Sequence, residues 1–275
     1  NFSIIGNISA YAPSSLQYGI KNVAHSKVFL DRIVMESLAV GYYSDTPGPE
    51  VYLGANLLQC VTKTCSTGFL FSTNEYHTAV GCIARGCYDV GFDIASGNIA
   101  LIGGAATSCN VGVKIRASAN DAHGICSGLQ INHNSQAIYI DTIANGFTFD
   151  ACHVYYGNIY VISSTGVQFI GGEYDVLAYY FDGSTGTTFE NIRFPMVNTN
   201  TINDSYNSHP STEEWTHCRK LDGAPFIGGY ASMTPVNGAQ TLTYAQSHAD
   251  ELELLAGATG AVTLTSRRMP KSSVQ

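Results

Sequence analysis

The sequence predicts an all-β protein whose main part is a right-handed parallel β-helix, and three observations support this. Charged residues make up only 12% of the 275 residues, and there are 28 glycines, whereas an average domain is about a quarter charged. Apolar residues recur every 20 to 25 positions. Short alternating segments separated by Gly, Asn, Asp and Ser lie between them. A coil of this length cannot bury its own apolar face, so successive coils must stack.

The first apolar column is clearest in three stretches that each open with Phe and end with an apolar residue five positions later. They begin at Phe149, Phe169 and Phe189, which are 20 residues apart. Towards the N-terminus, the same column is predicted to continue through four apolar residues, and Leu30 is an earlier member. The four are Ile125, Leu101, Val80 and Leu58. Leucine-rich repeats share the period, but their Leu/Asn spacing and helical segment are absent here.

A second column supports the first. Its members are short segments of alternating pattern, each 10 to 13 residues after a member of the first column: Phe69–Phe71, Phe92–Ile94, Val113–Ile115, Ile138–Ile140, Ile159–Val161 and Tyr179–Phe181. Alternation of this kind is typical of β-strands. Two or three strands per coil therefore predict stacked parallel sheets, with strands of adjacent coils about 4.8 Å apart.

The repeat divides the chain into three parts. Residues 1–195 are predicted to form the β-helix, and the start, Asn1–Asn7, reads like the middle of a strand pattern, so we expect a longer protein. Residues 196–235 are largely polar and aperiodic, contain the only tryptophan, Trp215, and are predicted to be a loop or linker. Residues 236–275 are predicted to form a small β module that caps the helix or joins subunits. In it, Leu252–Leu255 and Ala261–Thr265 resemble a hairpin.

Composition disfavours several classes of function. The net charge is −8 and the 13 Lys and Arg residues form no run, which argues against binding of nucleic acid or of an acidic membrane surface. No apolar stretch approaches the ~20 residues of a membrane helix. The eight cysteines include no C-x-x-C pair, so we expect no zinc or other metal and no cofactor. We interpret the cysteines as mostly free, buried thiols, which fits assembly in a reducing compartment.

Several stretches resemble the tailspikes and capsule depolymerases of tailed bacteriophages and, more broadly, the pectate-lyase-like β-helices. They are FTFDAC (147–152), VQFIGG (167–172), TTFENIRF (187–194) and GATGAVTLT (257–265). The resemblance implies a homotrimer in the virion tail, attached through an N-terminal part that precedes this sequence. It would be assembled in the host cytoplasm and act outside the cell on bacterial surface polysaccharide. Such proteins cleave capsule or O-antigen by hydrolysis or β-elimination, but the quoted motifs are structural and transfer no catalytic residue.

The register of the coils predicts which side chains face outward. If Phe149, Phe169 and Phe189 point inward, two further inward columns follow after a bend at Ala151, Gly171 and Asn191. These inward columns are Cys152/Gly172/Ile192 and Val154/Tyr174/Phe194. The residues between them form one outward patch, which is predicted to contain His153, Tyr155, Glu173, Asp175 and Arg193, edged by Asp150 and Glu190.

This patch is the candidate site. Glu173 and Asp175, with His153, are the candidate catalytic residues, because two carboxylates with divided roles perform glycosidic cleavage. A second carboxylate nearby is expected to raise the pKa of Asp175. Arg193 could clamp an acidic sugar and Tyr155 could stack on a sugar ring, with Asp150 and Glu190 as further substrate-binding residues. The paired carboxylates favour hydrolysis over elimination, although His153 and Arg193 keep a lyase open.

Two simpler interpretations remain beside this one. Outer residues of a β-helix are polar by default, and His, Glu and Arg on adjacent coils make a stabilising ladder that needs no substrate. The whole chain could equally be a non-catalytic, glycan-binding tail fibre or adhesin. Other polar residues give weaker signals: Glu75, His77, Asp89 and Asp93 on earlier coils, and Asp121, His123 and His133 as scattered metal ligands.

Overall fold

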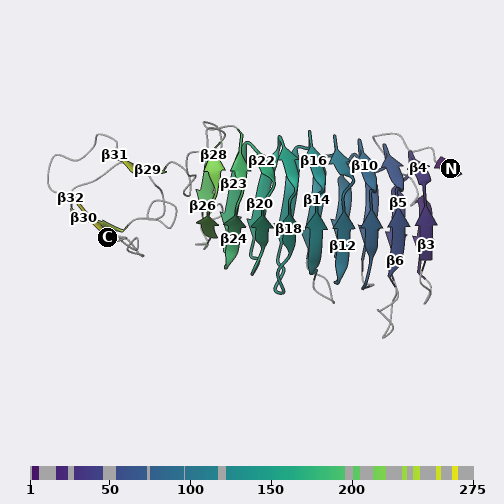
Figure 1. Ribbon diagram of the computed structural model, residues 1–275, viewed down its shortest axis with the longest axis horizontal. Helices are drawn as coiled ribbons and strands as arrows, with labels where there is room; N and C mark the ends of the chain where they lie inside the picture. The colour runs from purple at the N-terminus through teal and green to yellow at the C-terminus, as the bar shows by residue number, and fades with distance from the viewer. Residues whose placement is uncertain are drawn as a thin grey trace.

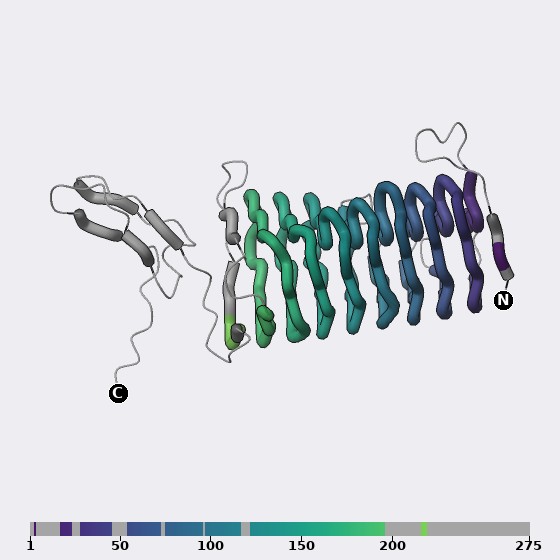
Figure 2. The backbone as a smooth tube through the Cα atoms, turned by 90° about the horizontal axis from the view of Figure 1, so that it is seen from above, coloured from purple at the N-terminus to yellow at the C-terminus, as the bar shows by residue number. Residues whose placement is uncertain are grey.

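A computed structural model shows an all-β chain whose strands stack as a parallel β-solenoid (Figure 1). It describes residues 2–5, 17–23, 28–45, 54–72, 75–95, 97–116, 122–195 and 213–220, and the strands at 201–204, 231–233, 238–241, 252–254 and 262–265. Within these ranges there is no helix that could cross a membrane. The predicted parallel β-helix is confirmed, and its coils follow one another along a single axis (Figure 2).

Each coil contributes one strand to each of three parallel sheets. The ten-stranded first sheet contains β1 (Phe2–Ile5), β4 (Ile33–Glu36), β7 (Val61–Lys63), β10 (Ile83–Arg85), β13 (Ala105–Thr107), β16 (Gln130–Asn132), β19 (His153–Tyr155), β22 (Glu173–Asp175), β25 (Arg193–Phe194) and β28 (Arg219–Lys220). The nine-stranded second sheet contains β2 (Tyr18–Asn22), β5 (Val40–Ser44), β8 (Thr67–Phe71), β11 (Val90–Ile94), β14 (Val111–Arg116), β17 (Gln136–Asp141), β20 (Asn158–Ile162), β23 (Ala178–Asp182) and β26 (Thr201–Asp204). The nine-stranded third sheet contains β3 (Val28–Asp31), β6 (Ala55–Leu58), β9 (Thr78–Val80), β12 (Ile99–Ile102), β15 (Gly124–Ser127), β18 (Thr148–Asp150), β21 (Gln168–Ile170), β24 (Thr187–Glu190) and β27 (Glu213–Thr216).

The core consists of columns of buried side chains that run along the axis. In the third sheet, Phe149, Phe169 and Phe189 are in register, with ring centroids 5.1 and 4.5 Å apart and the rings nearly parallel. All three are completely buried. The second predicted column is confirmed as well, because Ile138, Ile159 and their counterparts on the other coils are in register and buried. Stacked rings and branched side chains thus form one buried cluster that continues from coil to coil.

The first column was predicted one residue out of register on three coils. The inward residues there are Leu57, Ala79 and Cys126, which pair along the column with Leu30, Leu101 and Phe149. The predicted Leu58, Val80 and Ile125 point outward instead, and Val80 is 36% exposed. Because side chains alternate along a strand, a slip of one residue exchanges the two faces. On two of these coils a small inward residue, Ala79 or Cys126, lies beside a larger outward one, and on the third both residues are leucine, so side-chain size did not mark the inward face.

A sharp turn joins the third sheet to the first on every coil. Its key residue adopts a left-handed conformation, with φ of 49° at Ala151, 61° at Gly171 and 55° at Asn191, which confirms the predicted bend. After the bend, Gly172 has φ of 84°, and a Cβ atom there would collide with the backbone of Cys152. This turn fixes the faces of β19, β22 and β25 relative to the core.

All eight cysteines are free and buried, as predicted. Several occupy turn positions, where the thiol donates to backbone carbonyl groups of its own and the preceding coil. Cys152 Sγ, for example, lies 3.4 Å from the carbonyl oxygen of Cys126 and 3.5 Å from that of Asp150. The thiols therefore satisfy turn carbonyls while filling small spaces in the core.

The solenoid continues beyond the predicted boundary at residue 195. Strands β26, β27 and β28 fall in the segment predicted to be a loop, yet they add to the three sheets, and Trp215 in β27 is in register with Phe189. The predicted hairpin is also wrong in its pairing. β31 (Leu252–Leu254) pairs in parallel with β29 (Ala231–Met233), and β32 (Val262–Thr265) pairs in parallel with β30 (Gly238–Thr241). Apart from His217 and Cys218, the rest of 196–275 lies outside the described residues.

Candidate functional site

The predicted patch forms on the outer face of the first sheet. His153, Glu173 and Arg193 are in register on adjacent coils, and Tyr155 is in register with Asp175. The side chains between them, Val154, Tyr174 and Phe194, are completely buried. Alternation along these strands therefore directs the five polar side chains to the outside. The arrangement of the patch is as the sequence predicted.

Glu173 is the centre of the patch. Its Oε1 atom accepts a hydrogen bond of 2.6 Å from the Tyr155 hydroxyl. Its Oε2 atom lies 3.5 Å from Nη1 of Arg193, with which it forms an ion pair. The Glu173 side chain is 20% exposed and that of Arg193 is 57% exposed. Two neighbouring coils thus hold the carboxylate from opposite sides and fix its position.

Asp175 lies two residues further along the same strand and on the same face. Partial burial raises the pKa of its carboxyl group above the usual value, and the negative charge of Glu173 raises it further. Tyr155 faces both carboxylates. Its hydrogen bond to Glu173 is the largest cause that raises the pKa of its phenol to about 12, so the phenol keeps its proton and acts as a donor. The patch therefore contains one fixed carboxylate and one carboxyl group that holds a proton more strongly than usual.

The other predicted residues lie at the border of the patch. His153 is exposed, and its ring centroid is 6.4 Å from that of Tyr155. Asp150 and Glu190 lie across the bend on the third sheet, in one column with Ile170 between them. Asp150 accepts a hydrogen bond of 3.0 Å from Ser127, and Glu190 accepts one of 3.3 Å from Asn191. They edge the patch, but no contact joins either of them to Glu173 or Asp175 in this part of the structure.

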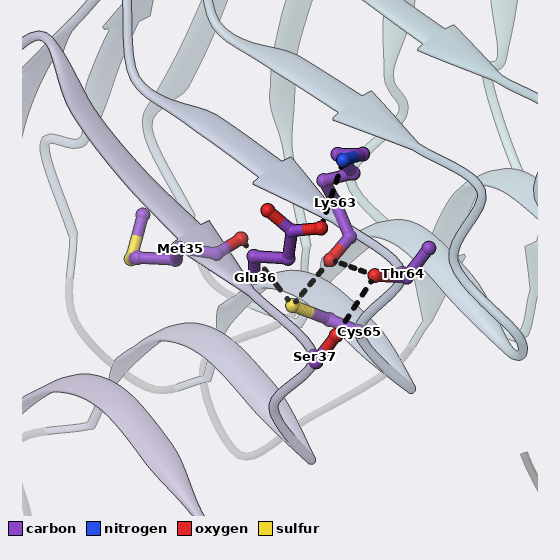
Figure 3. Close-up of polar contacts among 6 residues, drawn as sticks. All are labelled: Met35, Glu36, Ser37, Lys63, Thr64 and Cys65. Atoms are coloured by element: carbon purple, nitrogen blue, oxygen red, sulfur yellow. Dashed lines mark hydrogen bonds and ion pairs between the residues drawn. The ribbon is translucent and has the colours of Figure 1, made fainter. Parts of the chain in front are cut away.

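An ion pair elsewhere on the same face shows what a purely structural ladder looks like. Lys63 Nζ lies 2.8 Å from Glu36 Oε1 on adjacent coils (Figure 3). At the next position, the hydroxyls of Ser37 and Thr64 lie 3.2 Å apart (Figure 3). Exposed pairs of this kind contribute about 1 kcal/mol or less. The Glu173 patch differs because a phenol and a guanidinium share one carboxylate, with a second carboxyl group beside it.

Two of the weaker candidates, Asp93 and Glu75, have polar partners on the next coil. Asp93 forms an ion pair of 2.7 Å with Arg116 on the next coil. Glu75 accepts a hydrogen bond of 2.8 Å from Asn98. Asp121 lies outside the described residues, and among those that the structure describes no group of three potential ligands could hold a metal ion.

Sequence reasoning missed an aromatic pair at the edge of the patch. The rings of His133 and Tyr156 are stacked, with centroids 4.5 Å apart and an angle of 12° between the planes. Both residues occupy the turn from the first sheet to the second and have left-handed backbone conformations. The available signal was positional, because the equivalent residues on earlier coils are Ser37, Thr64, Gly86 and Ser108. Large rings stand where the turn elsewhere has small residues.

Comparison with known proteins identifies no relative. No protein-family model matches the chain, and neither a curated protein nor a solved structure matches it significantly. The class that the fold defines is therefore the parallel β-solenoid, and the chemistry of the site must be inferred from its own residues.

Proposed function

We propose that the protein is a tailspike-type depolymerase that binds bacterial surface polysaccharide, either capsule or O-antigen, and cleaves it by glycoside hydrolysis. The observation that carries this proposal is the pairing on β22: Glu173 is fixed by Tyr155 and Arg193, and Asp175 beside it has a raised pKa. A carboxylate held by two protein partners, beside a carboxyl group with a raised pKa, suits a general base and a general acid.

The chemical step can be assigned to these residues. Asp175 donates its proton to the glycosidic oxygen, and the bond between that oxygen and the anomeric carbon breaks with its electron pair moving to the oxygen. Glu173 takes a proton from a water molecule whose oxygen bonds to the anomeric carbon. Direct attack of this water on the anomeric carbon, without a covalent intermediate, is the inverting course of hydrolysis.

The remaining residues have supporting roles in this proposal. Arg193 is largely exposed although it is paired with Glu173, so its guanidinium can also contact a carboxylate of an acidic sugar. His153 is exposed in the same column, where its imidazole can reach a substrate bound over the acid–base pair. The outer face of the solenoid suits the binding of a long polymer, because its strands repeat at about 4.8 Å per coil. Side-by-side association into a homotrimer and attachment to a virion remain part of the proposal.

A second candidate function is a non-catalytic glycan-binding fibre or adhesin. The contacts of Glu173 favour it, because both carboxylate oxygens already have protein partners, as in a structural ladder. The same patch would then recognise a glycan without cleaving it. A lyase is a further alternative, in which an exposed base and Arg193 would act on a uronate.

The test is a screen of the purified protein against capsular polysaccharides and O-antigen lipopolysaccharides, both neutral and uronate-containing. Release of new reducing ends, without the ultraviolet absorbance of an unsaturated uronate, is the expected result. Absorbance by the product would assign a lyase instead. Binding to a polysaccharide without release of new reducing ends would contradict the enzyme and support the glycan-binding fibre.

A further inference from the structure

We propose that the stacked rings of His133 and Tyr156 form a sugar-binding subsite that takes the apolar face of one pyranose ring, directly beside the Glu173–Asp175 pair. This inference rests on the proposed function and extends it, because it states where the polysaccharide enters the site. It is carried by the geometry of the turn between the first and second sheets.

The turn forms a column of left-handed residues at the corner between the first and second sheets. The column runs through Ser37, Thr64, Gly86, Ser108, His133 and Tyr156, with φ between 49° and 61°. Neighbours in this column contact each other, as the Ser37 and Thr64 hydroxyls do in Figure 3. By the same geometry, the ring of His133 covers one face of the Tyr156 ring.

The column ends at Tyr156. The residue above it on the next coil is Val176, because Tyr155 is in register with Asp175 and Asn158 with Ala178. Val176 is not among the left-handed residues, and its side chain is buried in the core. Among the described coils, the column therefore has no further outward side chain after Tyr156. Tyr156 itself is 48% exposed. His133 covers one face of the Tyr156 ring, while on the next coil the same turn holds the buried Val176 and the exposed Leu177. The ring face away from His133 is the surface that we assign to the ligand.

This face lies beside the proposed acid. The backbone N–H of Tyr156 donates a hydrogen bond of 2.8 Å to the carbonyl oxygen of Asp175. Tyr155, the preceding residue, holds Glu173. A pyranose placed on Tyr156 would thus be next to the two carboxyl groups, and the following saccharide units could run over β22.

The choice of tyrosine at this position is not explained by the turn. A bulky side chain with positive φ is strained, whereas Asn and Gly accept this conformation readily. Gly86 and Ser108 occupy equivalent positions on earlier coils without such a ring. Strained residues concentrate at functional sites. A sugar ring offers C–H groups on one face, which pack against an aromatic ring.

The experiment uses an array of purified bacterial capsular polysaccharides, neutral and acidic, probed with Asp175→Asn protein so that bound polymer stays intact. Tyr156→Asn is introduced on this background, because Asn suits the left-handed turn and should leave the melting temperature unchanged or higher. Tyr156→Phe keeps the ring. Tyr76→Asn is the matched control: Tyr76 also has positive φ (59°) and is 50% exposed, but it lies between β8 and β9.

We expect Tyr156→Asn to weaken binding about fivefold to tenfold, and Tyr156→Phe and Tyr76→Asn to change it less than twofold. Equal binding by Tyr156→Asn and the parent overturns the subsite and leaves the proposed function standing. A loss of binding confined to Tyr156→Asn supports the subsite. If the wild-type protein then releases no reducing ends, the subsite stands and the enzymatic function is wrong. Failure of the wild-type protein to bind any polysaccharide overturns both.

Discussion

At the scale of single residues, the central feature is the difference in surroundings between two carboxyl groups on one strand. Glu173 has a partner for each oxygen, whereas Asp175 is partly buried next to that charge. The sequence predicted both the outward position of these residues and the raised pKa of Asp175. It could not predict that the Tyr155 hydroxyl binds Glu173, because that contact depends on the rotamers of side chains on two coils.

Replacing Tyr155 with Phe tests the hydrogen bond to Glu173. Hydrogen bonds to charged groups contribute about 1.5–3 kcal/mol, so we expect kcat on a cleaved polysaccharide to fall about tenfold or more. KM should change little, because the ring remains. Tyr88→Phe, an exposed tyrosine on an earlier coil, is the control. An unchanged kcat in Tyr155→Phe would show that the Tyr155 hydroxyl has no role in the mechanism.

Replacing Asp175 with Asn tests the raised pKa through stability. The folded protein holds the Asp175 proton more strongly than the unfolded chain does. This contribution to stability is complete below the unfolded pKa and is lost as pH rises through the folded pKa. The melting temperature of Asp175→Asn relative to wild type should therefore be higher at pH 7 than at pH 3. Calorimetry at both pH values measures this.

Asp89→Asn, which removes an exposed carboxylate on an earlier coil, controls for the change in net charge. A relative melting temperature that falls between pH 3 and pH 7 would show that the folded state favours the charged form of Asp175. The assignment of Asp175 as the acid would then be wrong.

At the scale of elements, the register of the coils decides which residues face outward. The coils that begin with Phe149, Phe169 and Phe189 were placed correctly, because a large ring marks the inward position without ambiguity. On earlier coils, Ala79 and Cys126 fill that position beside the larger outward residues Val80 and Ile125, so apolar size pointed to the wrong face. The residues of the candidate site were assigned to the correct face because they lie on the coils that begin with Phe149, Phe169 and Phe189.

In the turn before β22, the free energy of unfolding is predicted to depend strongly on Gly172 and only weakly on Gly171. Gly172→Ala would place a Cβ atom against the Cys152 backbone, and we expect a loss of more than about 2 kcal/mol in the free energy of unfolding. Gly171→Ala should cost only about 1 kcal/mol, because Ala151 already adopts the same left-handed conformation and space is open. Denaturant titration compares the two. Equal losses would contradict the described turn.

At the scale of the whole molecule, three continuous sheets enclose one core that runs along the axis (Figure 2). The sequence predicted the parallel β-helix from its composition, the period of its apolar residues and the alternating segments between them. It placed the end of the solenoid too early, since β26–β28 follow polar segments that lack the Phe signal. Strand pairing between distant residues, rather than local pattern, extends the sheets there.

The eight thiols provide a test of the whole fold. All are buried, and burial raises the pKa of several, including Cys152 to about 12 and Cys218 to about 11. We expect almost no reaction with a thiol-specific reagent in the native protein at pH 8, and complete reaction in denaturant. Reduction should leave the melting temperature unchanged. Rapid labelling of native protein, or a fall in melting temperature on reduction, would contradict a core of free thiols.

The measurement that tests the central claim most directly is the rate of reducing-end release from a bound polysaccharide by wild type, Glu173→Gln and Asp175→Asn. Glu36→Gln, in the structural pair with Lys63, serves as the matched control. The account predicts that Glu173→Gln and Asp175→Asn each lower turnover by at least ~10²-fold while binding persists, and that Glu36→Gln does not. Near wild-type rates in both Glu173→Gln and Asp175→Asn would contradict it and move the catalytic site elsewhere on the molecule.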